Sequence, residues 1–151
     1  MDNLLEQFWK WAEITPLEYA NTGLNQKTSK REDEFPCFRR LISYAKKIVD
    51  KNPTEQKDLD DPLTILDLDN EAEEILDYLE QNGSYGLLKN LMAISRNHIQ
   101  PEAKWQLAEL VFRRKPDGYV DFLIVLANDY HPYVKKRAEN CLKYLNAQNT
   151  T

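Results

Sequence analysis

Glycine, cysteine and histidine are scarce in this sequence. Only four glycines occur in 151 residues, which disfavours folds built on tight turns and excludes a glycine-rich phosphate loop. The two cysteines, Cys37 and Cys141, are far apart, and each stands among apolar residues at helical spacing. We therefore predict two buried free thiols, and neither a disulfide nor a metal site.

Long hydrophobic runs are also absent. No segment approaches the roughly 18 consecutive apolar residues that a membrane-spanning helix needs. The first residues, MDNLLEQFWKWAE, are acidic and lack the architecture of a signal peptide. With 42% hydrophobic residues, the chain has enough apolar side chains for one core. We expect a single domain over residues 1–151, located in the cytoplasm and not bound to a membrane.

Negative charge is concentrated in one part of the chain. Residues 52–81 contain eleven acidic side chains and one lysine, a local net charge of −10, whereas the whole chain has a net charge of −5. The flanking segments are mildly basic, with +1 over residues 1–51 and +4 over residues 83–151. We call residues 52–81 the acidic block. Its position between basic flanks is the sharpest functional signal in the sequence.

Apolar residues recur at helical spacing through most of the chain. Over residues 1–51 this pattern predicts N-terminal helices around a polar segment, 21–34, which we expect to be a mobile loop. Over residues 52–82 it predicts an acidic loop that contains Pro62, followed by a helix from about residue 70.

Residues 84–146 contain a repeat. Each unit has the pattern of a helix, a short turn, a proline and a second helix, and Pro101 and Pro132 are equivalent at an offset of about 31 or 32 residues. Helix pairs repeated at this period are typical of an α-solenoid, in which each pair buries its apolar face against the next. We therefore predict an all-α fold, a solenoid or bundle of seven or eight helices, with a disordered tail at 147–151.

The second repeat unit also resembles a known family. Its segment HPYVKKRAENCLKYL, residues 131–145, has the order of proline, valine, basic residue, alanine and leucine found in the second helix of a HEAT repeat. One helical stripe contains Val134, Ala138, Cys141, Leu142 and Leu145. The resemblance covers residues 84–146 and implies a HEAT-like solenoid, without indicating a function.

Signals of catalysis are weak. His98 and His131 occupy equivalent turns before a proline, where a turn or capping role explains them better than catalysis. The segment that begins DLDNEAEE at residue 67 fails as a calcium loop, because Ala72 replaces the required glycine and Tyr78 replaces the bidentate glutamate. We predict a protein that is not an enzyme and has no cofactor or metal.

Two basic clusters invite a nucleic-acid interpretation. The three cations at 135–137 are consecutive, so on a helix they spread over about 200° and cannot form one ridge. Those at 113–115 end a predicted helix, where cations oppose the helix dipole favourably. The acidic block would also repel phosphates. A protein partner is therefore favoured over direct binding of nucleic acid.

The acidic block has two interpretations. It is either a solvated face with a charged loop or a docking surface for a basic protein, which a clustered negative field would attract and nearby aromatic residues would anchor. On the second interpretation, the candidate partner-binding residues are Asp58, Asp60, Asp61, Asp67, Asp69, Glu73, Glu74, Asp77, Tyr78, Tyr85 and Trp105.

A further resemblance concerns function. A small acidic chain with WAEITPLEY at 11–19 and EFPCFRRLISYAKKIV at 34–49, followed by HEAT-like helices, resembles bacterial immunity proteins of contact-dependent inhibition and other polymorphic toxin systems. The resemblance implies a cytoplasmic protein, monomeric before complex formation, that neutralises a basic toxin domain such as a nuclease by covering it. The alternatives are a HEAT-like adapter in a larger assembly and a HEAT-like DNA-repair protein.

Overall fold

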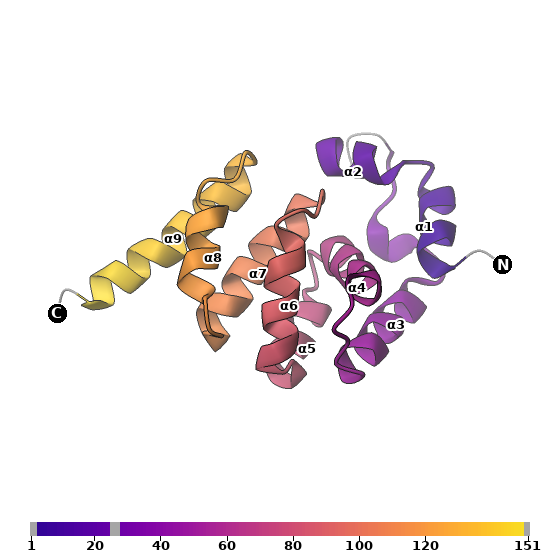
Figure 1. Ribbon diagram of the computed structural model, residues 1–151. Coiled ribbons are helices and arrows are strands. Elements are labelled where there is room, and N and C mark those ends of the chain that lie inside the picture. The colour runs from indigo at the N-terminus through magenta and orange to yellow at the C-terminus, as the bar shows by residue number, and fades with distance from the viewer. Residues whose placement is uncertain (1–2, 25–27, 150–151) are drawn as a thin grey trace.

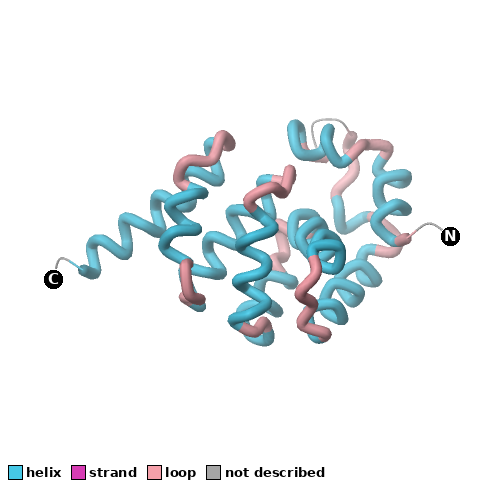
Figure 2. Tube along the Cα trace, viewed as in Figure 1, coloured by secondary structure: helices cyan, strands magenta, loops and turns pink. Residues whose placement is uncertain are grey.

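The computed structural model describes residues 3–24 and 28–149, and all secondary structure in these ranges is helical (Figure 1, Figure 2). Helices account for 73% of the described residues, which confirms the predicted all-α class. The elements are α1 (Leu4–Ala12), α2 (Pro16–Thr22), the 3₁₀ helix η1 (Glu32–Glu34), α3 (Phe38–Asp50), α4 (Gln56–Leu68), α5 (Glu74–Asn82), α6 (Tyr85–Ser95), α7 (Pro101–Arg114), α8 (Tyr119–Leu126) and α9 (Pro132–Asn149).

The helices are stacked along an elongated molecule. α1 and α9 lie at opposite ends, and the remaining long helices follow between them roughly in chain order (Figure 1). α7 packs against α4, α5, α6, α8 and α9, so it forms the centre of the stack. α4 packs against α3 and α6 as well, and it joins the N-terminal helices to the repeat. Among the described residues, no helix combines the length and apolarity needed to cross a bilayer.

Local capping signals begin several helices. Asn3 and Thr15 each accept a hydrogen bond from the backbone N–H three residues later. The carboxylates of Glu6 and Glu18 accept the backbone N–H of the cap residue, so α1 and α2 start with capping boxes. The hydroxyl of Ser84 caps α6 in the same position. These signals are local, which is why the sequence alone identifies them.

Both predicted helix pairs are present, α6 with α7 and α8 with α9. Pro101 and Pro132 are the first residues of α7 and α9, where proline is tolerated because that N–H has no helical partner. The segment 119–126, whose apolar run could also suit a strand, is helical. His98 and His131 lie in the two equivalent turns, as predicted.

One core runs through the stack, from Leu5 in α1 to Cys141 in α9. Both cysteines are free thiols, as predicted, although Cys37 is only half-buried. Ala138 and Val134 are fully buried on the predicted stripe of α9. Leu142 and Leu145, on the same predicted stripe, are only half-buried and pack against the core near the end of α9.

The predicted acidic loop is wrong, because residues 56–68 form α4. Leu59, Leu63 and Leu66 stand at helical spacing and are almost completely buried, so their burial stabilises the helix despite its aspartates. Pro62 removes one backbone bond, to the carbonyl of Asp58 in the exposed first turn. This extra helix helps to bring the total in the described residues to nine, above the predicted seven or eight.

The limits of the predicted loop at 21–34 also differ. α2 continues to Thr22, whose hydroxyl donates to the Glu18 carbonyl, and residues 32–34 form η1. Residues 25–27 of this loop lie outside the described residues.

Two further boundaries are corrected. The second acidic helix, α5, begins at Glu74 and not near residue 70, because residues 69–73 form a turn. The predicted tail is helical as far as Asn149, since α9 continues to that residue, while residues 150–151 lie outside the described residues.

Candidate acidic binding cleft

The structure spreads the acidic block over several surfaces. Asp58, Asp60 and Asp77 are exposed on α4 and α5, as a docking surface requires. Asp61 is half-buried and accepts a hydrogen bond of 2.8 Å from the Tyr44 hydroxyl. These carboxylates are present at the surface but do not form one patch with the rest of the block.

Asp67 and Asp69 are buried, with exposed fractions of 0% and 2%, so their prediction as surface contacts is wrong. Asp67 Oδ1 accepts the Ala103 N–H at 3.0 Å, in the first turn of α7. Asp69 Oδ2 accepts the Ile75 N–H at 2.8 Å, in the first turn of α5. Both carboxylates satisfy helix N–H groups that have no partner within their own helix. They serve the fold by stabilising the first turns of α7 and α5.

Three of the predicted partner-binding residues lie at or near the start of α5, and they differ in whether their side chains are free to bind a partner. Glu74 accepts bonds from Arg39, at 2.6 and 2.9 Å, and from Lys46 at 2.7 Å, and these bonds lower its pKa to about 2. The Tyr78 hydroxyl donates to Asp50 at 2.6 Å. Glu73 is half-buried immediately before α5. Glu74 and Tyr78 are thus engaged within the chain.

The two remaining aromatics also differ. Trp105 is only 5% exposed, its indole N–H donates to Glu102, and the Arg137 guanidinium lies 4.7 Å from its ring centre. It belongs to the packing of α7, so its prediction as a surface anchor is wrong. Tyr85 is 55% exposed beside the Arg114 guanidinium, 4.8 Å from its ring, and it remains accessible.

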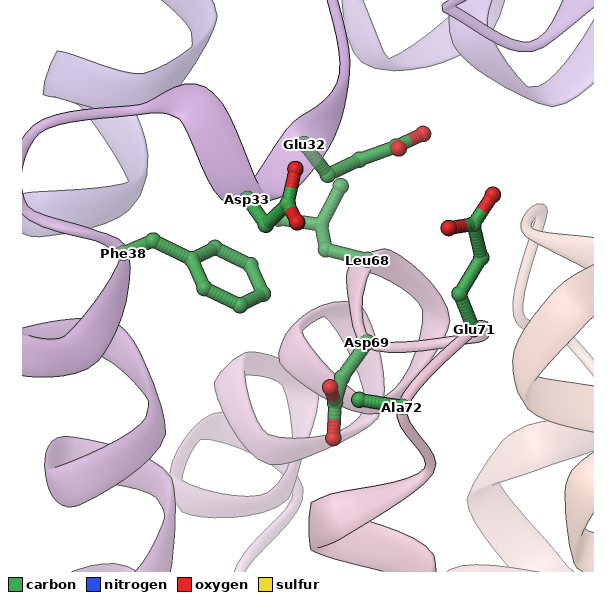
Figure 3. A pocket seen from close by; sticks show the side chains of 7 residues that line it. All are labelled: Glu32, Asp33, Phe38, Leu68, Asp69, Glu71 and Ala72. Atoms are coloured by element: carbon green, nitrogen blue, oxygen red, sulfur yellow. The ribbon is translucent and has the colours of Figure 1, made fainter.

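A different group of acidic residues gathers around one cavity. We define the acidic cleft as a cavity of about 310 Å³ lined by η1, the start of α3 and the turn between α4 and α5 (Figure 3). In Figure 3 the carboxylates of Glu32 and Glu71 lie on one side of the opening and the Phe38 ring lies on the other. The lining residues are Glu32, Asp33, Phe38, Leu68, Asp69, Glu71 and Ala72.

The negative charge of the cleft is poorly compensated. Burial raises the pKa of Glu32, and the charges of Glu71 and Asp33 raise it further against the lowering effect of its hydrogen bonds. Burial likewise raises the pKa of Asp69 to about 6. Within the described residues Glu71 has no ion pair, and Asp33 pairs only with Arg31, at 3.5 Å on the exposed surface, where such pairs are weak.

Sequence reasoning missed three of the four carboxylates of this site, because only Asp69 is among the predicted partner-binding residues. Glu32 and Asp33 belong to the run REDEF at 31–35, whose first four residues fall in the predicted loop at 21–34 and outside the acidic block. Glu71 lies in the acidic block but is not among the predicted residues. The signal available was the adjacency of three carboxylates to an aromatic residue. Nothing local indicates that this run faces Glu71, because the packing of η1 on α3 brings them together.

The cleft is suited to organic cations. Its carboxylates are arranged around an open cavity with an aromatic wall, a combination that accepts charge-assisted hydrogen bonds from an ammonium or guanidinium group. Across the described ranges, no group of three or more His, Cys, Asp or Glu side chains is placed to hold a metal ion. A cationic side chain is therefore the ligand class that this geometry favours.

Comparison with known proteins gives no match: no protein-family model, curated protein or solved structure is similar to this chain.

Proposed function

We propose that this protein is an immunity protein, which binds a basic toxin domain and neutralises it by covering the toxin's active or substrate-binding surface. The observation that carries the proposal is the acidic cleft, where Glu32, Asp33 and Glu71 face one cavity and Glu71 has no ion pair among the described residues. A nuclease presents a positive surface to its phosphate substrate. An acidic cleft complements that surface and competes with the nucleic acid.

The electrostatics of the acidic cleft favour a role in binding a cationic partner over a role as a solvated surface. Like charges that crowd one cavity repel each other, and the raised pKa of Glu32 reflects that repulsion together with burial. A cationic partner would remove the repulsion when it binds. The same field would accelerate association and make it sensitive to salt, since screening limits its reach to about 8 Å near physiological ionic strength.

The cellular setting follows from the resemblance of the sequence to bacterial immunity proteins. In this proposal the protein acts in the bacterial cytoplasm, as a monomer until it meets the toxin. It performs no catalysis and binds no nucleic acid, because its contribution is to cover a surface.

The proposal is tested with the protein encoded by the gene that neighbours the gene of this protein. We expect the C-terminal domain of that neighbour to be basic, to arrest growth when it is expressed alone in a laboratory bacterium, and to be harmless when it is co-expressed with the wild-type protein. The double variant Asp33→Lys with Glu71→Lys should weaken binding at least about tenfold, or about 1.4 kcal/mol, in surface-plasmon measurements.

The matched control is Asp121→Lys, a charge reversal at an exposed carboxylate of α8 far along the chain, which should leave binding within about twofold. Circular dichroism checks that each variant folds. A neighbour that is not toxic, or a toxin that the wild-type protein does not neutralise, rules out the immunity role. Equal binding by the cleft variant and the control rules out the cleft as the interface.

A further inference from the structure

A second cavity adjoins the acidic cleft and shares Glu32 with it. This polar pocket, of about 390 Å³, lies between the last turn of α2, the turn after α4, the start of α7 and the turn before α9. Its size is within the range of about 300–1,000 Å³ of cavities that hold small ligands. The polar side chains that matter here are Tyr19, Glu32, Asn70, Gln100, Glu102 and His131.

Gln100 brings an unsatisfied acceptor to this pocket. Its side chain is 1% exposed, and its Nε2 donates to the Pro16 carbonyl at 2.8 Å. That bond fixes the orientation of the amide, so Oε1 has to accept. No donor among the described residues reaches Oε1. A buried acceptor without a donor is unfavourable.

The two carboxylates of the pocket each have one oxygen engaged. Glu32 accepts from the Tyr19 hydroxyl at 2.9 Å, and Glu102 accepts from the Trp105 indole N–H. Neither carboxylate forms an ion pair within the described residues. Behind them lies Asp67, whose Oδ2 is also buried without a donor. The pocket therefore contains acceptors in excess of donors, and its charge is negative.

The pKa directions agree with this geometry. Burial raises the pKa of Asp67 well above its usual value, and the charge of Glu102 raises it further. Burial also raises the pKa of Tyr19, with added contributions from Asp67 and Glu32. Four acidic groups thus influence one another across a small volume, and a cation placed among them would relieve all four.

We infer that this pocket holds the guanidinium group of an arginine side chain supplied by a basic protein partner. A guanidinium carries five N–H donors in one plane and no acceptor, which suits acceptors contributed by several different elements. A lysine ammonium has three donors at a single point and satisfies fewer of them. The inference rests on the proposed function for its partner, while the pocket can be tested alone.

The first experiment uses small cations on the isolated protein. In NMR titrations, propylguanidinium should shift the Trp105 indole and Gln100 amide signals and saturate with a Kd of about 1 mM. Butylammonium, matched in length, should bind at least about fivefold more weakly, because it has fewer donors. A Gly-Gly-Arg-Gly-Gly peptide should bind at least as well as propylguanidinium, if the pocket admits a side chain from a protein.

Variants locate the binding. Glu32→Gln and Glu102→Gln each keep an oxygen for Tyr19 or Trp105 but remove a charge, and each should weaken propylguanidinium binding about tenfold, or about 1.4 kcal/mol. Glu139→Gln is the matched control, because Glu139 lies on α9 and lines neither this pocket nor the acidic cleft. Its effect should be at most about twofold.

The outcomes separate this inference from the proposed function. Absence of saturable binding, equal binding of both small cations, exclusion of the peptide, or an equal loss in Glu139→Gln each overturns the arginine pocket. Toxin neutralisation could still be intact in those cases. Conversely, saturable binding of the arginine peptide supports the pocket even when no neighbouring toxin is neutralised, and then only the immunity role fails.

Discussion

The two halves of this molecule differ in how they compensate charge. In the repeat, Lys104 pairs with Asp129 at 3.1 Å, and Arg137 pairs with Glu109 at 2.6 Å while lying over the Trp105 ring. In the acidic cleft, by contrast, carboxylates face one another and the described residues supply almost no cations. Charges in the repeat hold helices to each other, whereas charges in the cleft are available to a partner.

This difference also explains the basic clusters. Arg114 donates to the carbonyls of Leu79 and Glu80, at 3.2 and 2.9 Å, and so caps the end of α5 as well as ending its own helix. Arg113 pairs with the Glu80 carboxylate at 3.0 Å. Two of the three cations of the cluster at 113–115 are therefore engaged within the chain.

The largest expected effect is predicted for the repeat, where the charges form ion pairs. The Lys104–Asp129 pair joins α7 to the turn before α9, and its side chains are 6% and 10% exposed. Lys104→Met leaves the Asp129 carboxylate buried without its cation, so the free energy of unfolding should fall by about 3–5 kcal/mol. Urea denaturation measures the loss.

The control is Lys135→Met, the same substitution at an exposed position of α9, which should change stability by less than about 0.5 kcal/mol. A loss of under about 1 kcal/mol in Lys104→Met would mean that compensation in the repeat is incidental to its stability.

The next prediction concerns the pH dependence of the cleft. Asp69 has a pKa of about 6 in the folded protein, raised by burial from an ordinary value of 3.8. Between these values the folded state binds more protons than the unfolded state, so stability falls as pH rises through that interval. The loss is about 1–3 kcal/mol.

Asp69→Asn removes the titration and still offers an oxygen to the Ile75 N–H. This variant should therefore match the wild type near about pH 4 and exceed it in stability by about 1–3 kcal/mol near about pH 7. Asp117→Asn, at an exposed turn, controls for the loss of one charge. If the free energy of unfolding differed between Asp69→Asn and the wild type by the same amount at both pH values, burial of the Asp69 charge would have no energetic cost.

Most of the fold can be predicted from the sequence because helical periodicity and capping are local. The pairs α6 with α7 and α8 with α9 follow from spacing and from the positions of Pro101 and Pro132. α4 was missed since its aspartates and Pro62 mask three leucines at helical spacing, and only the packing against α3 and α7 explains why the helix forms.

The candidate site is less predictable, for physical reasons. Aspartate is usually exposed, so Asp67 and Asp69 were assigned to the surface, and no local pattern marks a carboxylate that caps a helix elsewhere in the chain. Their partners are Ala103 and Ile75. The opposite error concerns Glu32, which the sequence pattern places in a loop although it lines two cavities. Both errors arise from tertiary contacts.

The smallest expected effect is the most direct test of the difference between the repeat and the acidic cleft. The same substitution, glutamate to glutamine, should change stability in opposite directions in the two regions. Glu109 in the repeat pairs with Arg137 at 2.6 Å and Arg113 at 3.7 Å. Glu109→Gln should therefore lower stability by about 0.5–1 kcal/mol. Glu71 in the acidic cleft faces other carboxylates and has no ion pair among the described residues, so Glu71→Gln should raise stability by up to about 0.5 kcal/mol at low salt.

Both effects should shrink as salt is added, since screening weakens attraction and repulsion alike. Urea denaturation at two ionic strengths measures them, and averaging over repeated titrations is needed at this size. A destabilising Glu71→Gln would contradict the claim that the negative charge of the acidic cleft is uncompensated, because Glu71 would then be held by an attraction within the chain. If both substitutions stabilised the protein, the repeat would be no better compensated than the cleft, and charge pairing could not be used to choose between them as a binding surface.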